Sequence, residues 1–310
     1  MADNSPELIN HQSLLVNLGK INTYLRLMRP ANVVTSVADV LAGIAISGYF
    51  LNGNVDYKIV FLLCLSTAGL YAGGIVFNDI FDSELDKIER PERAIPSGAV
   101  RISEAVVLGS LLMVLGIISA FFVGLLPGII AFGIAIAAMI YNKFSKHYSF
   151  LGPLNMGVCR GMNLWLGLSI LSYSFNQWEI LGMIPLIYIF SITMISQGEV
   201  HGGSIRNLYT GGFLYLVVIC FILTVAQIKD NLFLTLVFLL PFALMIFLPL
   251  IKAIEDPVGK NVGKAVKAGV ISLILMDAAW AATFGAVYAA IAIAFLLPIS
   301  IWLSKRFAVT

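Results

Sequence analysis

The chain has 310 residues, of which 59% are hydrophobic and 12% are charged, and its mean hydropathy is +0.94. A soluble domain carries about 25% charged residues, so this composition excludes a soluble globular protein and indicates a membrane protein built from helices. The net charge of +2 says little about partners, and we expect no nucleic-acid partner. The three cysteines lie in apolar stretches without CxxC spacing, which indicates neither a disulfide framework nor a zinc site.

The N-terminal residues form two patterns. Residues 1–12 are polar and do not have the pattern of a cleavable signal peptide. Apolar residues then recur at helical spacing from Leu14 to Met28, alongside lysine and arginine. This predicts an amphipathic helix over 13–29 that lies on the membrane surface; the alternative is a solvated lead-in to the first span.

Long apolar stretches follow, and each is close to the ~20 residues that cross a bilayer. The predicted spans lie near 32–51, 58–79, 103–124, 127–142, 153–174, 179–198, 208–227 and 232–251. A last apolar tract, 265–303, is too long for one span and is predicted to break near Gly285. Helices are the only plausible form because open strand edges stay unsatisfied in lipid. We therefore predict an all-α integral membrane protein with nine or ten transmembrane helices, in a single domain over 1–310.

Basic residues predict the orientation. They follow spans two, four, six and eight, whereas the loops at 52–57 and 175–178 are nearly free of lysine and arginine. By the positive-inside rule these exits and the N-terminus face the cytoplasm. Lys305 and Arg306 share that side only with ten spans, so parity favours ten.

The second span ends in "NDIFDSELD", from Asn78 to Asp86. Asp79, Asp82 and Asp86 are spaced i, i+3, i+7 and so lie along one helix face. Like charges on one stripe repel each other, and burying them unpaired is costly. A hard divalent cation removes both problems, and carboxylate oxygens suit Mg²⁺. The sequence therefore predicts a Mg²⁺ site here, and the basic residues just downstream are expected to grip a phosphate.

The stretch from Asn78 to Gly98 resembles the first aspartate-rich motif of the UbiA superfamily of intramembrane prenyltransferases, NDxxDxxxD followed by an RPxRPIxxG-type loop. Ala94 stands where proline is common. "RPANVVT" (Arg29–Thr35) and "YNKFSKHYSFLG" (Tyr141–Gly152) are also similar to the family.

This resemblance implies a helical bundle around a central cavity that opens laterally to lipid. It implies Mg²⁺-dependent transfer of a prenyl group from a polyisoprenyl diphosphate to an aromatic or other lipophilic acceptor. The implied metal ligands are Asn78, Asp79, Asp82 and Asp86, of which Asp79 and Asp82 are catalytic. The implied diphosphate ligands are Arg93 and Lys146, with Arg90, Lys143 and Arg206 as further candidates.

The predicted sixth span ends in "SQGEVHGG", where family members carry a second cluster, DxxDxEGD. Its aspartate positions become Ser196, Glu199 and Gly203, and its glutamate becomes His201, so only Glu199 keeps a carboxylate. Three accounts stay open. In the first, Glu199 holds a second Mg²⁺, with Arg206 supplying positive charge. In the second, Glu199 and His201 form an acid–base pair in which His201 takes the proton of the acceptor. In the third, the site binds a diphosphate or other lipid without turnover.

"GEVHGGS" and "LGPLNMGVCRGMNLWLG" (Leu151–Gly167) resemble the EboC-type branch of UbiA-like proteins. Within the second stretch, Arg160 and Asn163 lie one turn apart inside a predicted span. A buried arginine in a span normally pairs with an anion or a carboxylate. Arg160 is therefore a candidate diphosphate ligand, and its rival role is a structural pair with Asp277. For the mid-span Asp277, proton relay, acceptor hydrogen bond and ion pair all stay open.

Two other functions compete with prenyl transfer. One is a non-catalytic lipid or metabolite carrier, or an export component, that keeps the diphosphate-binding site. The other is a terpene cyclase on the same scaffold. In each case we expect an integral protein of a bacterial inner membrane whose polar site faces the cytoplasm.

Overall fold

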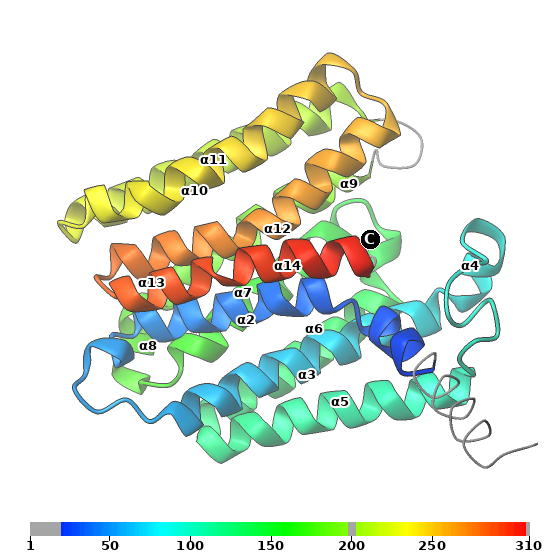
Figure 1. Ribbon diagram of the computed structural model, residues 1–310, viewed down its shortest axis with the longest axis horizontal. Helices are drawn as coiled ribbons and strands as arrows, with labels where there is room; N and C mark the ends of the chain where they lie inside the picture. The colour runs from blue at the N-terminus through cyan, green and yellow to red at the C-terminus, as the bar shows by residue number, and fades with distance from the viewer. Residues whose placement is uncertain (1–19, 198–202, 308–310) are drawn as a thin grey trace, which may run out of the picture.

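The computed structural model describes residues 20–197 and 203–307, and every regular element in these two ranges is helical (Figure 1). A first helix spans Lys20–Met28. The α-helices that follow are α2 (Pro30–Ile46), α3 (Tyr57–Phe81), α4 (Ser83–Glu89), α5 (Ile102–Val123), α6 (Leu125–Lys143), α7 (Leu151–Leu168), α8 (Ser172–Trp178), α9 (Met183–Ser196), α10 (Ile205–Ile228), α11 (Leu232–Glu255), α12 (Gly259–Thr283), α13 (Val287–Ala294) and α14 (Leu296–Arg306). Short 3₁₀ turns, Tyr49–Leu51, Ser145–His147 and Glu179–Gly182, complete the set.

The protein is an integral, polytopic membrane protein. In the described residues eight helices are long and apolar enough to cross a membrane, or nine if the bent pair of Lys20–Met28 and α2 is one span. Helix α7 has sufficient length, 18 residues, but Arg160 and Asn163 lower its hydropathy. Because α7 packs against α2, α6 and α9, we count it as a tenth pass. The predicted all-α membrane fold is confirmed.

The long C-terminal apolar tract breaks where the sequence predicts it. Helix α12 ends at Thr283, Gly285 has a φ of +78°, and α13 begins at Val287. Glycine adopts this left-handed conformation without steric cost. The chain therefore turns back, and α13 with α14 forms the last span.

One predicted loop is wrong. Residues 175–178 belong to α8, and the turn lies earlier, between Leu168 and Ser172. The hydroxyl of Ser174 donates to the carbonyl oxygen of Ser47 at 2.8 Å, which ties α8 to the end of α2. The predicted loop is therefore helical, and the chain reverses direction before α8.

The described part of the predicted surface helix covers Lys20–Met28 and meets α2 at a bend of 47°. Ile21 and Leu25 are exposed, whereas Leu27 is buried against Val76 and Val100. Residues 13–19 lie outside the described ranges, and the location of this helix on the membrane surface stays a prediction.

Helices α2, α7 and α12 form the centre of the bundle. The most apolar window of α12 is 83% buried, against 28% for α5 and for α11, so α12 lies inside and the other two present their side chains to lipid. Helix α2 packs on both α7 and α12. The polar site described next lies at the end of the bundle where α3 ends and α4 begins (Figure 1).

Candidate functional site

A cavity of about 470 Å³ opens between helices α2, α3, α6, α7, α9 and α12. Its mouth carries charged side chains from the α3–α4 junction and the loops beside it. Farther in, its wall is mainly apolar and includes Leu70, Ile134, Ile192, Val270 and Leu273. A polar mouth on an apolar chamber suits a ligand with a charged head and an apolar chain.

The acidic motif occupies the α3–α4 junction. Helix α3 ends at Phe81, Asp82 is its cap, and α4 begins at once with Ser83. The backbone N–H of Asp86 donates to the carbonyl oxygen of Asp82 at 2.8 Å, so the helical path runs almost unbroken through the junction. Asp79, Asp82 and Asp86 consequently lie on one side of it, as their spacing predicts.

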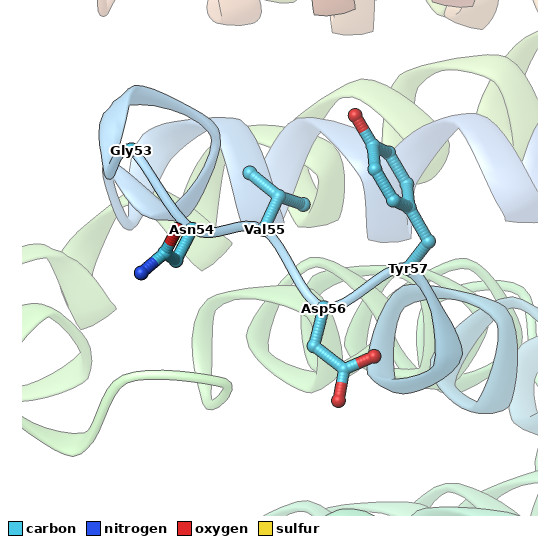
Figure 2. Close-up of a pocket in the computed structure, with 5 residues that line it drawn as sticks. All are labelled: Gly53, Asn54, Val55, Asp56 and Tyr57. Atoms are coloured by element: carbon cyan, nitrogen blue, oxygen red, sulfur yellow. The ribbon is translucent and has the colours of Figure 1, made fainter.

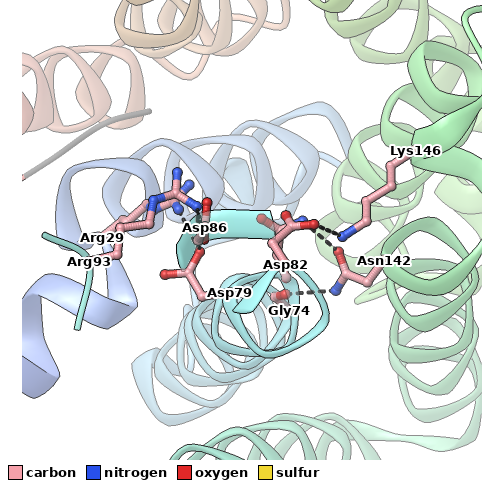
Figure 3. A network of polar contacts seen from close by, with 9 residues as sticks. Arg29, Gly74, Asp79, Asp82, Asp86, Arg93, Asn142 and Lys146 are labelled. Atoms are coloured by element: carbon pink, nitrogen blue, oxygen red, sulfur yellow. Dashed lines mark hydrogen bonds and ion pairs between the residues drawn. The ribbon is translucent and has the colours of Figure 1, made fainter. Parts of the chain in front are cut away.

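Each of the three carboxylates is paired with a cation (Figure 3). Arg29 lies 2.7 Å from Asp79. Arg93 lies 2.7 Å from Asp86 and 3.5 Å from Asp79. These side chains are largely buried, with between 5% and 17% of their surface exposed. Burial lowers the local dielectric and strengthens such pairs.

Asp82 completes this arrangement on the α6 side. Its carboxylate pairs with the Lys146 ammonium, which comes from the turn after α6 (Figure 3). Beside it, Asn78 donates to the side-chain oxygen of Asn142 at 3.2 Å, and Asn142 donates to the carbonyl oxygen of Gly74 at 2.9 Å. The Asn78 amide oxygen is therefore not used in these bonds and remains able to accept from, or bind to, a ligand.

Comparison with known proteins identifies the chain. Residues 40–260, more than two thirds of it, match the UbiA prenyltransferase family. The chain belongs to the UbiA prenyltransferase family. This match confirms the predicted superfamily and its prenyltransferase class, while the EboC-type branch within it stays a prediction.

Two archaeal relatives of the chain share one name. The digeranylgeranylglyceryl phosphate synthase of Saccharolobus solfataricus is 28% identical over 195 residues, which cover 61% of this chain and 67% of that protein. The synthase of Ignicoccus hospitalis is 34% identical over 185 residues, which cover 59% of each. The chain thus spans about two thirds of the length of these relatives, or less.

Solved structures of UbiA family members have the same fold. A digeranylgeranylglyceryl phosphate synthase superposes with a TM-score of 0.64 at 23% identity, covering 87% of this chain and 99% of that one. A UbiA homolog from Archaeoglobus fulgidus bound to GPP and Mg²⁺ gives 0.57 at 14% identity, covering 81% and 99%. At these identities the likeness shows the fold alone.

The UbiA-type cavity gathers most of the residues predicted for the site. Those that line it are Asn78, Asp82, Asp86, Arg90, Arg93, Lys146 and Arg160. Asp79 lies just behind this wall, held by Arg29 and Arg93. Lys143 and Arg206 are exposed outside the cavity lining. Glu199 and His201 lie outside the described residues, so their predicted roles stay predictions.

Three important residues were not predicted as site residues. Arg29 lies in "RPANVVT", whose likeness to the UbiA family was a usable signal. Asn142 lies in "YNK", beside the predicted Lys143 and Lys146. Asp39 offered only a lone carboxylate in an apolar run. It pairs with Arg160 at 2.5 Å, whereas the sequence offered Asp277 as the partner of that arginine.

The donor chemistry of this UbiA motif fits Mg²⁺. Among the described residues, no three His, Cys, Asp or Glu side chains converge to hold a metal ion by themselves. Mg²⁺ does not require such a cage, because it keeps several waters and is bound through one or two carboxylates together with substrate phosphates. Oxygen donors on one face at a cavity mouth match that mode, and the cations that now neutralise them match a diphosphate.

A second hollow, of about 420 Å³, lies in the loop before α3 (Figure 2). The residues that line it are consecutive, Gly53 to Tyr57, and all belong to this one loop. Asp56 caps α3 by accepting from the N–H of Lys58 at 2.9 Å. The hollow is accordingly a feature of a helix start, and it lies at the end of α3 opposite the acidic motif.

Proposed function

We propose that the protein transfers a prenyl group from a polyisoprenyl diphosphate to a lipophilic acceptor inside the membrane, with Mg²⁺ as cofactor. The observation that carries this proposal is the cluster of paired carboxylates and cations at the mouth of an apolar cavity. Family membership supports it, as does the Archaeoglobus fulgidus homolog, which binds GPP and Mg²⁺.

The roles follow from the two kinds of charge at the mouth. Asn78, Asp79, Asp82 and Asp86 would hold Mg²⁺ through their oxygens. When bound, Mg²⁺ neutralises charge that builds up on the departing diphosphate. Asp82 is the residue best exposed to the cavity among the three paired aspartates, with 21% of its side chain accessible, so we assign it the most direct role.

Arg93 and Lys146 would turn from the aspartates to the diphosphate oxygens, and Arg90 at the cavity wall would assist them. Charge-assisted hydrogen bonds to phosphate oxygens are short and strong. The apolar wall formed by Leu70, Ile134 and Leu273 would exclude water from the reacting carbon. Lys143 and Arg206 remain weaker candidates because both are exposed outside the lining.

The degenerate second motif leaves a second function in view. Ser196 lines the cavity where the resembling pattern has an aspartate. Glu199 as a second Mg²⁺ ligand, or as an acid–base partner of His201, is part of the proposal. If Glu199 has neither role, the charged mouth of the cavity binds a diphosphate without turnover, which is the carrier function. A cyclase would ionise the diphosphate without an external acceptor.

We further propose that the polar end of the bundle faces the cytoplasm. The excess of lysine and arginine at that end supports this orientation. The predicted bacterial inner membrane stays a prediction, because the relatives described above are archaeal.

Pyrophosphate release from radiolabelled geranylgeranyl diphosphate tests the function. The purified protein in lipid is incubated with a lipid extract of its host, with and without Mg²⁺. We expect Mg²⁺-dependent release, which Asp82→Asn lowers by about 100-fold or more, the usual size of a lost electrostatic contact in a transition state. Lys87→Met is the control, since Lys87 pairs with the exposed Glu84.

The labelled product separates the alternatives. A prenylated acceptor establishes a transferase, and a cyclised isoprenoid establishes a cyclase. Saturable binding without any release would instead establish a carrier. Undiminished release by a well-folded Asp82→Asn protein would contradict the assignment of the motif.

A further inference from the structure

A second polar cluster lies deep in the bundle, below the charged mouth of the cavity. The Arg160 guanidinium lies over the ring of Tyr71, 5.4 Å from its centroid. Tyr71 precedes Asp79 by eight residues in α3, which is about 12 Å along the helix axis. The cluster therefore lies about two helical turns below the acidic motif.

Contacts from three helices hold the cluster together. The Nε atom of Arg160 lies 2.5 Å from Oδ2 of Asp39, and its Nη2 donates to the Thr35 hydroxyl at 2.8 Å. Asn163 donates to the same Asp39 oxygen at 2.9 Å and accepts from the Thr67 hydroxyl at 2.6 Å. These residues come from α2, α3 and α7.

Asp277 of α12 adds a second carboxyl group. It is fully buried, as is Asp39. The two carboxyl groups lie within reach of a side-chain hydrogen bond. Yet Oδ1 of Asp39 and both oxygens of Asp277 lack a donor. Two ionised carboxylates cannot donate to each other, whereas one proton between them lets one carboxyl group donate to the other.

The charges lead to the same conclusion. Two carboxylates and one guanidinium leave one uncompensated negative charge inside the membrane, which is costly. One shared proton makes the group neutral. With the proton on Asp277, Asp39 stays ionised and pairs with the charged Arg160 guanidinium.

The proposal rests on the prenyl transfer described above. We propose that Asp39 and Asp277 share one proton and form with Arg160 a neutral triad, which holds the guanidinium at the inner cavity wall to bind the oxygen-bearing head of the acceptor. Asp39 and Asp277 are positioning residues in this arrangement, and Arg160, with Asn163 beside it, is the binding group.

The cavity wall explains why the occupant is the acceptor. Both Arg160 and Asn163 line the cavity, next to Leu70 and Leu273. A prenyl chain has no hydrogen-bond acceptor, so it gains nothing from a guanidinium. A hydroxyl or phosphate oxygen is complementary, because a guanidinium has five N–H groups and its contacts with Asp39, Thr35 and Tyr71 engage only part of them.

Infrared spectroscopy of the protein in lipid tests the shared proton. We expect a carbonyl band of a protonated carboxyl group in the wild type that disappears in Asp277→Asn. Asparagine has almost the same shape and can still donate to Asp39, so Asp277→Asn should keep its thermal unfolding temperature. A wild-type spectrum that matches the Asp277→Asn spectrum in this region would overturn the triad.

Probe binding tests the subsite. A lipophilic naphthol and a monoalkyl glycerophosphate are titrated into protein that holds Mg²⁺ and an uncleavable thiodiphosphate analogue of the prenyl donor. We expect one probe to bind the wild type saturably and to lose about tenfold in affinity, about 1.4 kcal/mol, in Arg160→Met. Arg160→Lys, which keeps the charge but not the fork geometry, should lose part of that affinity.

The two probes distinguish a phenolic from a glycerophosphate acceptor. Lys58→Met, at the opposite end of α3, is the control and should leave probe binding unchanged. Failure of both probes on the wild type, or wild-type affinity in a folded Arg160→Met or Arg160→Lys, would overturn the subsite. Failure of the thiodiphosphate analogue to bind the wild type would instead overturn the proposed function.

Discussion

At the scale of single residues, Arg29 shows how the site is assembled. It has φ 46° and ψ 66°, a left-handed conformation that is uncommon outside glycine and costs about 1–2 kcal/mol. The residue after it is Pro30, which disfavours the right-handed helical region for Arg29. The chain therefore bends by 47° between Lys20–Met28 and α2. This bend places the guanidinium 2.7 Å from Asp79, so a strained turn supplies one of the site's cations.

The paired charges predict cooperative binding of metal and diphosphate. Mg²⁺ alone must displace cations from the aspartates, and a diphosphate alone must displace aspartates from the cations. When both bind, the aspartates move from the cations to Mg²⁺ and the cations move from the aspartates to the diphosphate. We expect an uncleavable diphosphate analogue to raise the Mg²⁺ affinity by about tenfold or more, and Mg²⁺ to raise the analogue's affinity by the same factor. Calorimetric titrations of each ligand, with and without the other, measure both factors. If each ligand binds with the same affinity whether or not the other is present, the exchange of partners is contradicted.

Arg93 provides a second test of the same balance. Arg93→Met leaves Asp86 without its 2.7 Å partner and leaves Asp79 with Arg29 alone. Mg²⁺ by itself should then bind more tightly, while the diphosphate analogue loses about 1.5–3 kcal/mol, the usual value of a hydrogen bond to a charged group. Lys87→Met serves as the control. A change of both affinities in the same direction would argue against partner exchange.

At the scale of elements, the close approach of α2 and α7 sets the depth of the polar cluster. A Cβ atom on Gly43 would lie 2.3 Å from the carbonyl oxygen of Leu164, and one on Gly167 would lie 2.1 Å from that of Val40. Asp39 precedes Gly43 by four residues, and Arg160 precedes Leu164 by four. Asp39 and Arg160 thus lie one helical turn before the glycine contacts, which bring the two residues together.

This packing predicts a large stability effect from a single methyl group. Gly43→Ala and Gly167→Ala should each destabilise the protein by about 1–3 kcal/mol, because backbone atoms obstruct the new group. Gly74→Ala is the matched control, since its nearest neighbour would be Ala138 Cβ at 3.6 Å; it should leave stability unchanged or raise it, as helical alanine is favoured over glycine. Thermal unfolding in detergent ranks the three variants. An unaffected Gly167→Ala would refute the close contact.

At the scale of the whole molecule, charge is sorted between the two ends of the bundle. Of the 19 lysines and arginines, all of which the structure describes, Lys58 and Lys229 lie at one end and Arg160 lies within α7. The others lie at the end that carries the acidic motif and the last residues of α14 (Figure 1). Lys305 and Glu92 are therefore expected on the same side of the membrane. Ten passes require this, because Glu92 follows the second pass and Lys305 ends the tenth.

Labelling of introduced cysteines tests this topology. In a protein without Cys64, Cys159 and Cys220, Asn54→Cys and Glu92→Cys place thiols in exposed loops at opposite ends. We expect a membrane-impermeant thiol reagent to label Asn54→Cys on intact cells and Glu92→Cys only after the cells are opened. Labelling of both on intact cells, or the reverse order, would contradict the proposed orientation.

Much of the fold and half of the site follow from residue type and spacing alone. Apolar length specifies membrane helices because lipid leaves no other way to satisfy the backbone. Gly285 marks a turn because of its own conformational freedom. Asp79, Asp82 and Asp86 share a face because helical periodicity is local. Each of these conclusions depends on neighbours within a few turns, which a sequence displays directly.

Pairing between distant helices is different. The sequence places two carboxylates, Asp39 and Asp277, inside apolar stretches. Their residue types alone do not decide which of them pairs with Arg160. The approach of α2 to α7 through Gly43 and Gly167 decides it. The same holds for Arg29, whose partner is set by a bend between helices. The sequence by itself determined the class of fold, the acidic motif and its chemistry; the tertiary structure decided which charges meet, because ion pairs depend on distances that helix packing sets.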